Sequence, residues 1–249
     1  DGVYQRFHAQ FMMMNELQQR NRLSNVRLLK RQLVACENDG GFYVLHMQIS
    51  ASNTDYFESK RFEELNSGGD ETYTEYWTFV KKVGASTGSN ISGGEKCPNC
   101  GDSTKNKLGE VSICPNCKTQ INNGDYDWIL SEITQAEEFA GSYYKLAERQ
   151  KFYKKLAAAN HTGHEYSAQY IEDKASNAYL QIRIAQALCD EKRIQRFCSH
   201  GFMQNVKTRF NKPFLYNRLY TKTVDLINMY ENANTIFAVV SVSCTKQKV

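Results

Sequence analysis

The sequence lacks the features that would assign it to several common classes of protein. It contains no run of the ~20 apolar residues that a membrane-spanning helix needs, and no recognisable signal peptide. It contains no phosphate-binding loop, dinucleotide-binding fingerprint or nucleophile elbow. The sequence therefore predicts no transmembrane segment in this chain and does not support an enzyme. A membrane anchor upstream in a longer parent chain stays an open alternative.

Cysteine is too sparse for a framework of disulfides. The 249 residues contain 8 cysteines, whereas small secreted domains held by disulfides are much denser in them. Four of the 8 lie in two CPNC tetrads, and the surroundings of the others favour buried thiols (Cys36, Cys189, Cys198 and Cys244). This usage predicts a reducing compartment, either the cytoplasm or the cytoplasmic face of a membrane.

Charge is divided unevenly along the chain, although the net charge is only +4. Residues 1–140 hold 14 Lys and Arg against 19 Asp and Glu, while residues 141–249 hold 17 against 8. A basic C-terminal half favours an acidic partner such as an anionic membrane, an acidic protein or nucleic acid. A solvated basic face is the simpler interpretation.

Hydrophobic periodicity predicts an α+β fold. Apolar side chains at Phe7, Phe11, Met14 and Leu17 have helical spacing within residues 4–20. Alternating and β-branched patterns predict strands over residues 25–36, 42–52, 71–83 and 126–133, with the turn NDGG at 38–41 between the first two. Residues 135–195 have a helical composition, with one break at 159–165.

The two ends of the chain resemble each other. DGVYQRF at 1–7 resembles HGFMQNV at 200–206, and matching strand segments follow each in the same order. These segments are NVRLL and FYVLHMQISA in the first half, and TVDLI and IFAVVSVSCT in the second. The pattern predicts an internal repeat of helix, strand, turn and strand.

The two CPNC tetrads carry the clearest chemistry. Cys97, Cys100, Cys114 and Cys117 offer four thiolates, and each two-residue gap lets both sulfurs of a tetrad turn toward one ion. Zinc is the expected metal, with iron in the same geometry as the alternative. A catalytic zinc keeps an open position for water, so four cysteine ligands predict a structural zinc ribbon. Gly-, Ser- and Asn-rich flanks over residues 84–123 place this ribbon at a hairpin tip, between the third and fourth predicted strands.

Other candidate binding sites are weaker. No aromatic side chain lies between Cys97 and Cys117 to stack on bases, so nucleic-acid binding by the ribbon is disfavoured. His161 and His164 have no matching ligand nearby and are interpreted as loop residues. The run Met12–Met14 suggests a lipid- or peptide-binding surface, with partial core packing as the simpler interpretation.

Aromatic residues on the predicted strands could line a ligand cavity, with Tyr76, Trp77 and Trp128 as the candidates. Such a cavity would need an inward polar group, for example His46 or Glu75. Carboxylates are available for catalysis at Asp125, Asp127 and Glu132, but no histidine or cysteine is spaced to pair with them.

The order of these motifs resembles one family. EYWTFV at 75–80 and DWILSEI at 127–133 flank the cysteine tetrads, and YIEDKASNAYLQIRIAQ at 170–186 is similar to the opening helix of a second domain. In this the chain resembles bacterial Tim-forty-four-like proteins that carry a zinc ribbon. The resemblance implies a nuclear-transport-factor-two-like cone, in which helices pack on a curved antiparallel sheet. The mitochondrial member of the family resides at the inner membrane, binds acidic lipid and helps to tether the import motor.

These observations predict a division of the chain into four parts. They are a first Tim-forty-four-like domain without its opening helices (1–83 and 124–134), the zinc ribbon (84–123), a helical connector (135–164) and a partial second repeat (165–249). The expected function is that of a non-catalytic, membrane-associated scaffold or transport-type protein, with a protein or an anionic membrane surface as its partner. The alternatives are small-molecule or enzymatic use of the cone cavity, and nucleic-acid binding through the basic half. Separate folding of the two repeats, or one composite domain, stays open at this point.

Overall fold

The computed structural model describes residues 2–85, 96–104, 113–121, 124–143, 166–206, 216–233 and 235–248. The predicted ribbon insertion and helical connector lie partly outside these ranges, and His161 and His164 lie wholly outside them.

The described residues form helices and two antiparallel sheets, which confirms the α+β class. The helices are α1 (Gly2–Glu16), the short 3-10 turn η1 (Glu63–Leu65), α2 (Ala136–Tyr143), α4 (Ala168–Leu188), α5 (Glu191–Ile194) and α6 (His200–Val206). The strands are β1 (Gln19–Asp39), β2 (Phe42–Ser59), β3 (Ser67–Lys82), β4 (Ile129–Gln135), β5 (Tyr216–Asn232) and β6 (Thr235–Lys248).

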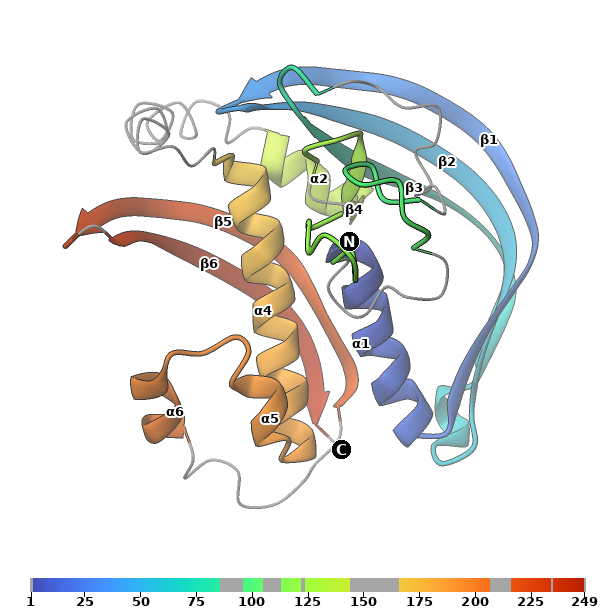
Figure 1. The fold of residues 1–249 in the computed structure, drawn as a ribbon. Coiled ribbons are helices and arrows are strands. Elements are labelled where there is room, and N and C mark those ends of the chain that lie inside the picture. The colour runs from blue at the N-terminus through green and yellow to red at the C-terminus, as the bar shows by residue number, and fades with distance from the viewer. Residues whose placement is uncertain are drawn as a thin grey trace.

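Strands β1 to β4 form one sheet in chain order, and its long strands arch around α1 (Figure 1). A tight turn joins β1 to β2 at the predicted NDGG, where Gly40 has a φ of 65° that suits glycine. The strands β2 and β3 pair without a break from Phe42 opposite Lys82 to Phe57 opposite Ser67. All four predicted strands are present, although β1 begins well before residue 25 because a bulge carries pairing past Asn25.

Helix α4 lies between the curved sheet and the β5–β6 hairpin (Figure 1). One buried cluster joins α1, α4 and β5, and consists of Ala9, Met13, Leu180, Ile184, Ala187 and Leu219. Burial of apolar side chains is the main favourable term in folding, so this cluster couples the three elements. The segments predicted as a first domain and a partial second repeat therefore share hydrophobic core.

Buried carboxylates fix α4 at three points along its first half. Asp39, at the end of β1, accepts hydrogen bonds from the backbone N–H groups of Ala168 (3.1 Å) and Gln169 (2.9 Å), and so caps the helix. Asp173 pairs with Arg6 of α1 at 2.7 Å. Glu172 accepts a hydrogen bond from the backbone N–H of Leu226 in β5 at 2.8 Å. Each buried carboxylate thus has a partner, which offsets the cost of taking it out of water.

The second half has the element order of the predicted repeat. Helix α6 precedes the β5–β6 hairpin, as α1 precedes β1 and β2. The packing of the two helices differs, because Met203 of α6 packs against Ala185 and Ile194 rather than against α1 or the curved sheet. The two halves thus share an order of elements, and the internal repeat stays a prediction.

Helix α1 does not bury all of the apolar residues that have helical spacing. Leu17 is fully buried, but Phe7 and Phe11 are 43% and 57% exposed, and the helix instead packs through Ala9 and Met13. The small side chain of Ala9 lets α4 approach closely on that side, and the helical spacing of the aromatic residues could not show this.

The prediction of buried thiols outside the tetrads is wrong. Cys36 is exposed, and Cys189, Cys198 and Cys244 are half-buried. Cys36 lies on the edge strand β1, and Cys189 ends α4 with a left-handed φ of 57°. An edge strand and a helix terminus leave these side chains near solvent despite their apolar neighbours in the sequence.

Candidate metal centre

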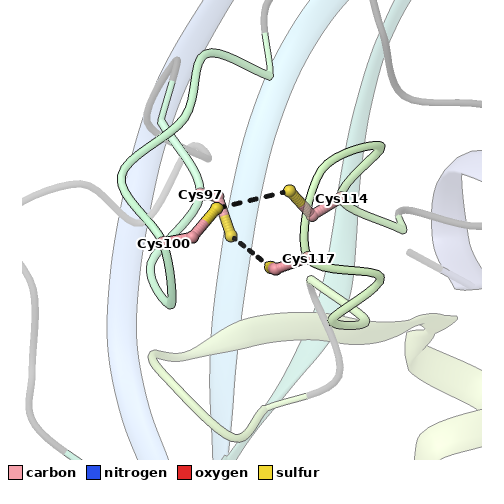
Figure 2. Close-up of side chains that lie close together, drawn as sticks. All are labelled: Cys97, Cys100, Cys114 and Cys117. Carbon is pink, nitrogen blue, oxygen red and sulfur yellow. Dashed lines mark hydrogen bonds between the residues drawn. The ribbon is translucent and has the colours of Figure 1, made fainter.

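The four cysteines of the two tetrads lie together, as predicted (Figure 2). Their Sγ atoms are all within 4.8 Å of one another. The distances from Cys97 Sγ to Cys117 Sγ and from Cys100 Sγ to Cys114 Sγ are both 3.7 Å. A tetrahedron with metal–sulfur bonds of ~2.3 Å has edges of ~3.8 Å, so these two pairs fit ligands of one ion.

The two tetrads fold into matching turns. Gly101 N–H donates to the carbonyl of Cys97 at 2.9 Å, and Lys118 N–H donates to the carbonyl of Cys114 at 3.0 Å. Both residues have a left-handed backbone, with φ of 74° at Gly101 and 62° at Lys118. Glycine takes this conformation freely, whereas lysine takes it at a cost. Lys118 Nζ also donates to the carbonyl of Pro115 at 2.6 Å, which helps to close the second turn.

The asparagine of each tetrad reaches across to a sulfur of the other. Asn99 Nδ2 lies 3.5 Å from Cys117 Sγ, and Asn116 Nδ2 lies 3.6 Å from Cys100 Sγ. Such hydrogen bonds orient the sulfurs and offset part of their negative charge. This role of the asparagines was not predicted from the sequence, although their equivalent positions in two identical tetrads were a usable signal.

Thr119 makes a further contact with Cys117 Sγ. Asn99 Nδ2 donates to Thr119 Oγ1 at 2.9 Å, and Cys117 Sγ lies within hydrogen-bond distance of the same oxygen, at 3.2 Å. The hydrogen bonds from Thr119 and Asn99 lower the pKa of the Cys117 thiol to about 5. At Cys114 a backbone hydrogen bond lowers the pKa, but burial and neighbouring thiols outweigh it and raise the pKa to about 11. The pKa of Cys117 is thus lowered while that of Cys114 is raised, because hydrogen bonds favour the thiolate of Cys117, whereas burial and the neighbouring thiols favour the protonated form of Cys114.

The centre has an inner and an outer side. Cys97 and Cys114 are buried against Ile121, whereas Cys100 is exposed. Apart from the cysteines, Ile121 is the buried apolar residue of this cluster, so the tip has little hydrophobic core. A four-thiolate set of this kind can hold a divalent ion such as zinc. When bound, the ion would supply folding free energy rather than an open position for water.

The three aromatic cavity candidates are not brought together. Tyr76 and Trp77 are consecutive residues of β3 and point to opposite faces of the sheet. Tyr76 stacks on Phe139 of α2, with ring centroids 3.9 Å apart. Lys81 Nζ lies over the ring of Trp128, 5.3 Å from the ring centroid. Lys81 is on the same face of β3 as Trp77.

The polar groups considered for a cavity have structural partners. His46 is buried between Thr78 and Glu37, with both ring nitrogens 2.9 Å from an oxygen. Glu75 accepts hydrogen bonds from Trp77 Nε1 at 3.0 Å and from Gln135 Nε2 at 3.2 Å.

Each of the acidic candidates contacts a different partner. Asp125 pairs with Lys82 at 3.8 Å, Asp127 Oδ1 accepts the backbone N–H of Trp128, and Glu132 accepts a hydrogen bond from Gln169 Nε2. In these contacts no nucleophile and base are paired.

A cavity that the sequence analysis did not predict lies between α1, α4 and β5. It has a volume of about 340 Å³ and is lined mainly by apolar side chains, among them Phe7, Met14, Phe57 and Leu180. Small-molecule pockets begin at about 300 Å³, so the cavity is at the lower end of that range. The sequence signal for this cavity was the run Met12–Met14, which was interpreted as partial core packing, with a lipid- or peptide-binding surface as the alternative; Met13 and Met14 line the cavity.

No protein-family model, curated protein or solved structure matches this chain. Among the described helices, none combines the length and apolar character needed to cross a membrane. Fold and site define the protein as an α+β protein with a four-cysteine cluster compatible with zinc binding.

Proposed function

We propose that this protein is a non-catalytic, membrane-associated scaffold of the transport type, in which a structural zinc ion folds the hairpin tip between β3 and β4. The observation that carries the proposal is the closed set of four thiol sulfurs. Four thiolates fill the tetrahedral shell of zinc, so the ion has no position left for substrate or activated water. The tip thus becomes a rigid projection suited to contact with another protein.

The contacts of the candidate catalytic groups support a non-catalytic role. His46, flanked by a hydroxyl and a carboxylate, is the arrangement closest to a catalytic relay. Thr78, which supplies the hydroxyl, is a buried residue with 1% exposure, so a substrate has no route to this oxygen. The hydrogen bonds of His46 with Glu37 and Thr78 therefore join β2 to its two neighbouring strands, β1 and β3.

The membrane part of the proposal depends on the resemblance to Tim-forty-four-like proteins and on the basic C-terminal half. The curved sheet with helices inside its arch is compatible with the nuclear-transport-factor-two-like cone implied by that resemblance (Figure 1). A basic surface on a peripheral protein gains free energy from anionic lipids, and salt screens that gain.

Vesicle flotation tests this proposal, with anionic and neutral vesicles compared at low and high salt. Binding to anionic vesicles alone, weakened by salt, is the expected result. No binding to either kind of vesicle would contradict membrane association by this chain. Zinc analysis of the same sample tests the other half of the proposal, with one zinc per chain expected.

The cavity between α1, α4 and β5 supports a second candidate function, the binding of a small apolar molecule. Gln10, Asn21 and Tyr220 place polar groups among its apolar lining, an arrangement common in ligand pockets. Fluorescence of an apolar dye should rise when the dye binds the unmodified protein. It should rise less with Met14→Trp, because the larger side chain fills the cavity. Equal fluorescence in both proteins would exclude the cavity as the binding site.

A further inference from the structure

Strand β1 is an exposed edge of the curved sheet. The strand order is β1-β2-β3-β4, and among the described residues no strand pairs with the outer side of β1. From Arg20 to Leu33 all fourteen consecutive residues are exposed. The outer backbone of such a strand offers N–H and C=O groups to another strand.

The pairing of β1 with β2 sorts its side chains onto two faces. Residues directly opposite each other in an antiparallel pair lie on the same face of the sheet, and β2 keeps one unbroken register with β3. Basic residues of β1 lie opposite even-numbered residues of β2: Arg20 opposite Glu58, Arg22 opposite Tyr56, Arg27 opposite Ser52 and Lys30 opposite Ser50. Leucines lie opposite odd-numbered residues: Leu23 opposite Asp55, Leu28 opposite Ala51 and Leu33 opposite Met47.

One face of β1 is therefore cationic and the other is aliphatic. Arg31, opposite Ile49, is the basic residue on the aliphatic side. The three leucines are 56%, 58% and 52% exposed, in the order Leu23, Leu28 and Leu33. This separation is hidden in the sequence, because bulges after Ser24 and Leu28 shift the alternation.

We propose that the outer edge of β1 binds an extended acidic and aliphatic segment of a partner protein, which adds to the sheet as a further strand. An added strand presents alternate side chains to the two faces, so acidic residues would meet the arginines while apolar residues meet the leucines. The longest run of β1 without a bulge, Gln19–Ser24, supplies Arg20, Arg22 and Leu23 to that contact, and Arg22 would exchange its ion pair with Glu58 of β2 for one with the added strand. This inference rests on β1 alone and does not depend on the zinc site.

Two other occupants fit the edge less well. A second copy of β1 would set its arginines against the same basic face, where like charges opposite each other are destabilising. An anionic bilayer would contact one face of the sheet, and the basic residues and the leucines are on opposite faces. Strand β1 is also curved along its length (Figure 1), so a flat bilayer would contact only part of it.

The test uses a labelled peptide of alternating glutamate and valine, matched in length to Gln19–Ser24, and measures fluorescence anisotropy. Arg20→Glu combined with Arg22→Glu should weaken binding by about tenfold or more, since it reverses the two basic charges that Gln19–Ser24 presents to the peptide. The matched control is Lys192→Glu with Arg196→Glu, which makes the same charge change at exposed residues around α5 and should leave binding unchanged. Equal loss in both variants would overturn the proposal.

Backbone pairing is tested separately from charge attraction. A peptide with alternate amides N-methylated should bind much more weakly, and the unmodified peptide should slow hydrogen exchange in Gln19–Ser24. Equal binding of the N-methylated peptide would overturn strand addition. Anionic vesicles that displace the peptide, or a dimer of the free protein that the β1 variants dissociate, would instead assign the edge to a membrane or to a second copy.

Discussion

Replacing Cys100 by serine should unfold the tip while the curved sheet stays folded. Cys100 is the exposed ligand of the four, so its replacement removes a thiolate without opening the buried side of the cluster. A structural zinc contributes roughly 10 kcal/mol or more to the folding of a small metal-binding unit. Burial of Ile121, the apolar residue of the tip cluster, is worth only ~1.5–3 kcal/mol. The tip therefore has too little core to fold once the ion is lost.

The sheet has closing contacts of its own at the base of the tip. The backbone N–H of Lys82 donates to the carbonyl of Gly124 at 2.8 Å, and β3 and β4 pair from Val80 opposite Ile129 to Glu75 opposite Gln135. These hydrogen bonds join residues on either side of the insertion. The free energy of unfolding of the sheet should consequently change by less than ~1 kcal/mol, as for a surface substitution.

Hydrogen exchange read by mass spectrometry, together with zinc analysis, measures both outcomes in one sample. In Cys100→Ser the peptides of residues 96–121 should exchange rapidly and the zinc content should fall, while peptides of β2 and β3 keep their protection. Cys36→Ser makes the same chemical change at an exposed cysteine outside the centre and should alter neither quantity. Loss of protection in β2 and β3 on chelation would refute the reasoning, because the ion would then hold the whole fold.

Three further perturbations test the packing between the sheet and its helices. Asp39→Ala removes the acceptor of two buried backbone N–H groups at the start of α4 and should lower the free energy of unfolding by ~1–3 kcal/mol in urea titrations; a change below ~0.5 kcal/mol would contradict the capping role. Phe139→Ala should cost ~3 kcal/mol or more, and a double-mutant cycle with Tyr76→Ala should give a coupling of ~0.5–1.5 kcal/mol; zero coupling would mean that the stack contributes nothing. Burial raises the pKa of Asp173 although Arg6 lies beside it, so the folded state retains a proton that the unfolded state releases. The contribution of Asp173 to the free energy of unfolding should be present below the ordinary pKa of aspartate and lost as pH rises through the raised pKa. If Asp173→Asn has the same pH dependence of stability as the unmodified protein, Asp173 makes no such contribution.

The four-cysteine cluster could be predicted from sequence because its geometry is local. Two residues between Cys97 and Cys100, and again between Cys114 and Cys117, are enough to turn each pair of sulfurs toward one point. The strands and the first helix were also predictable, since alternation and helical spacing report directly on which faces are apolar. The length of β1 was harder to predict, because the polar residues before Asn25 join this strand only through pairing with β2.

The arrangement of side chains between elements could not be predicted in the same way. Whether Phe7 or Ala9 of α1 is buried depends on where α4 crosses, which no pattern within α1 records. The separation of Arg27 and Leu28 onto two faces depends on bulges that are set by the partner strand. Burial of Asp39 depends on a helix that begins 129 residues later in the chain. In each case the information lies in a contact distant in sequence.

X-ray absorption spectroscopy at the zinc edge is the most direct test of the four-cysteine metal centre. The expected spectrum of the purified protein is that of one zinc with four sulfur ligands at ~2.3 Å and no oxygen or nitrogen ligand. A shell with three sulfurs and one oxygen or nitrogen at ~2.0 Å would contradict a closed structural site, because it would mean an open position at which water can react.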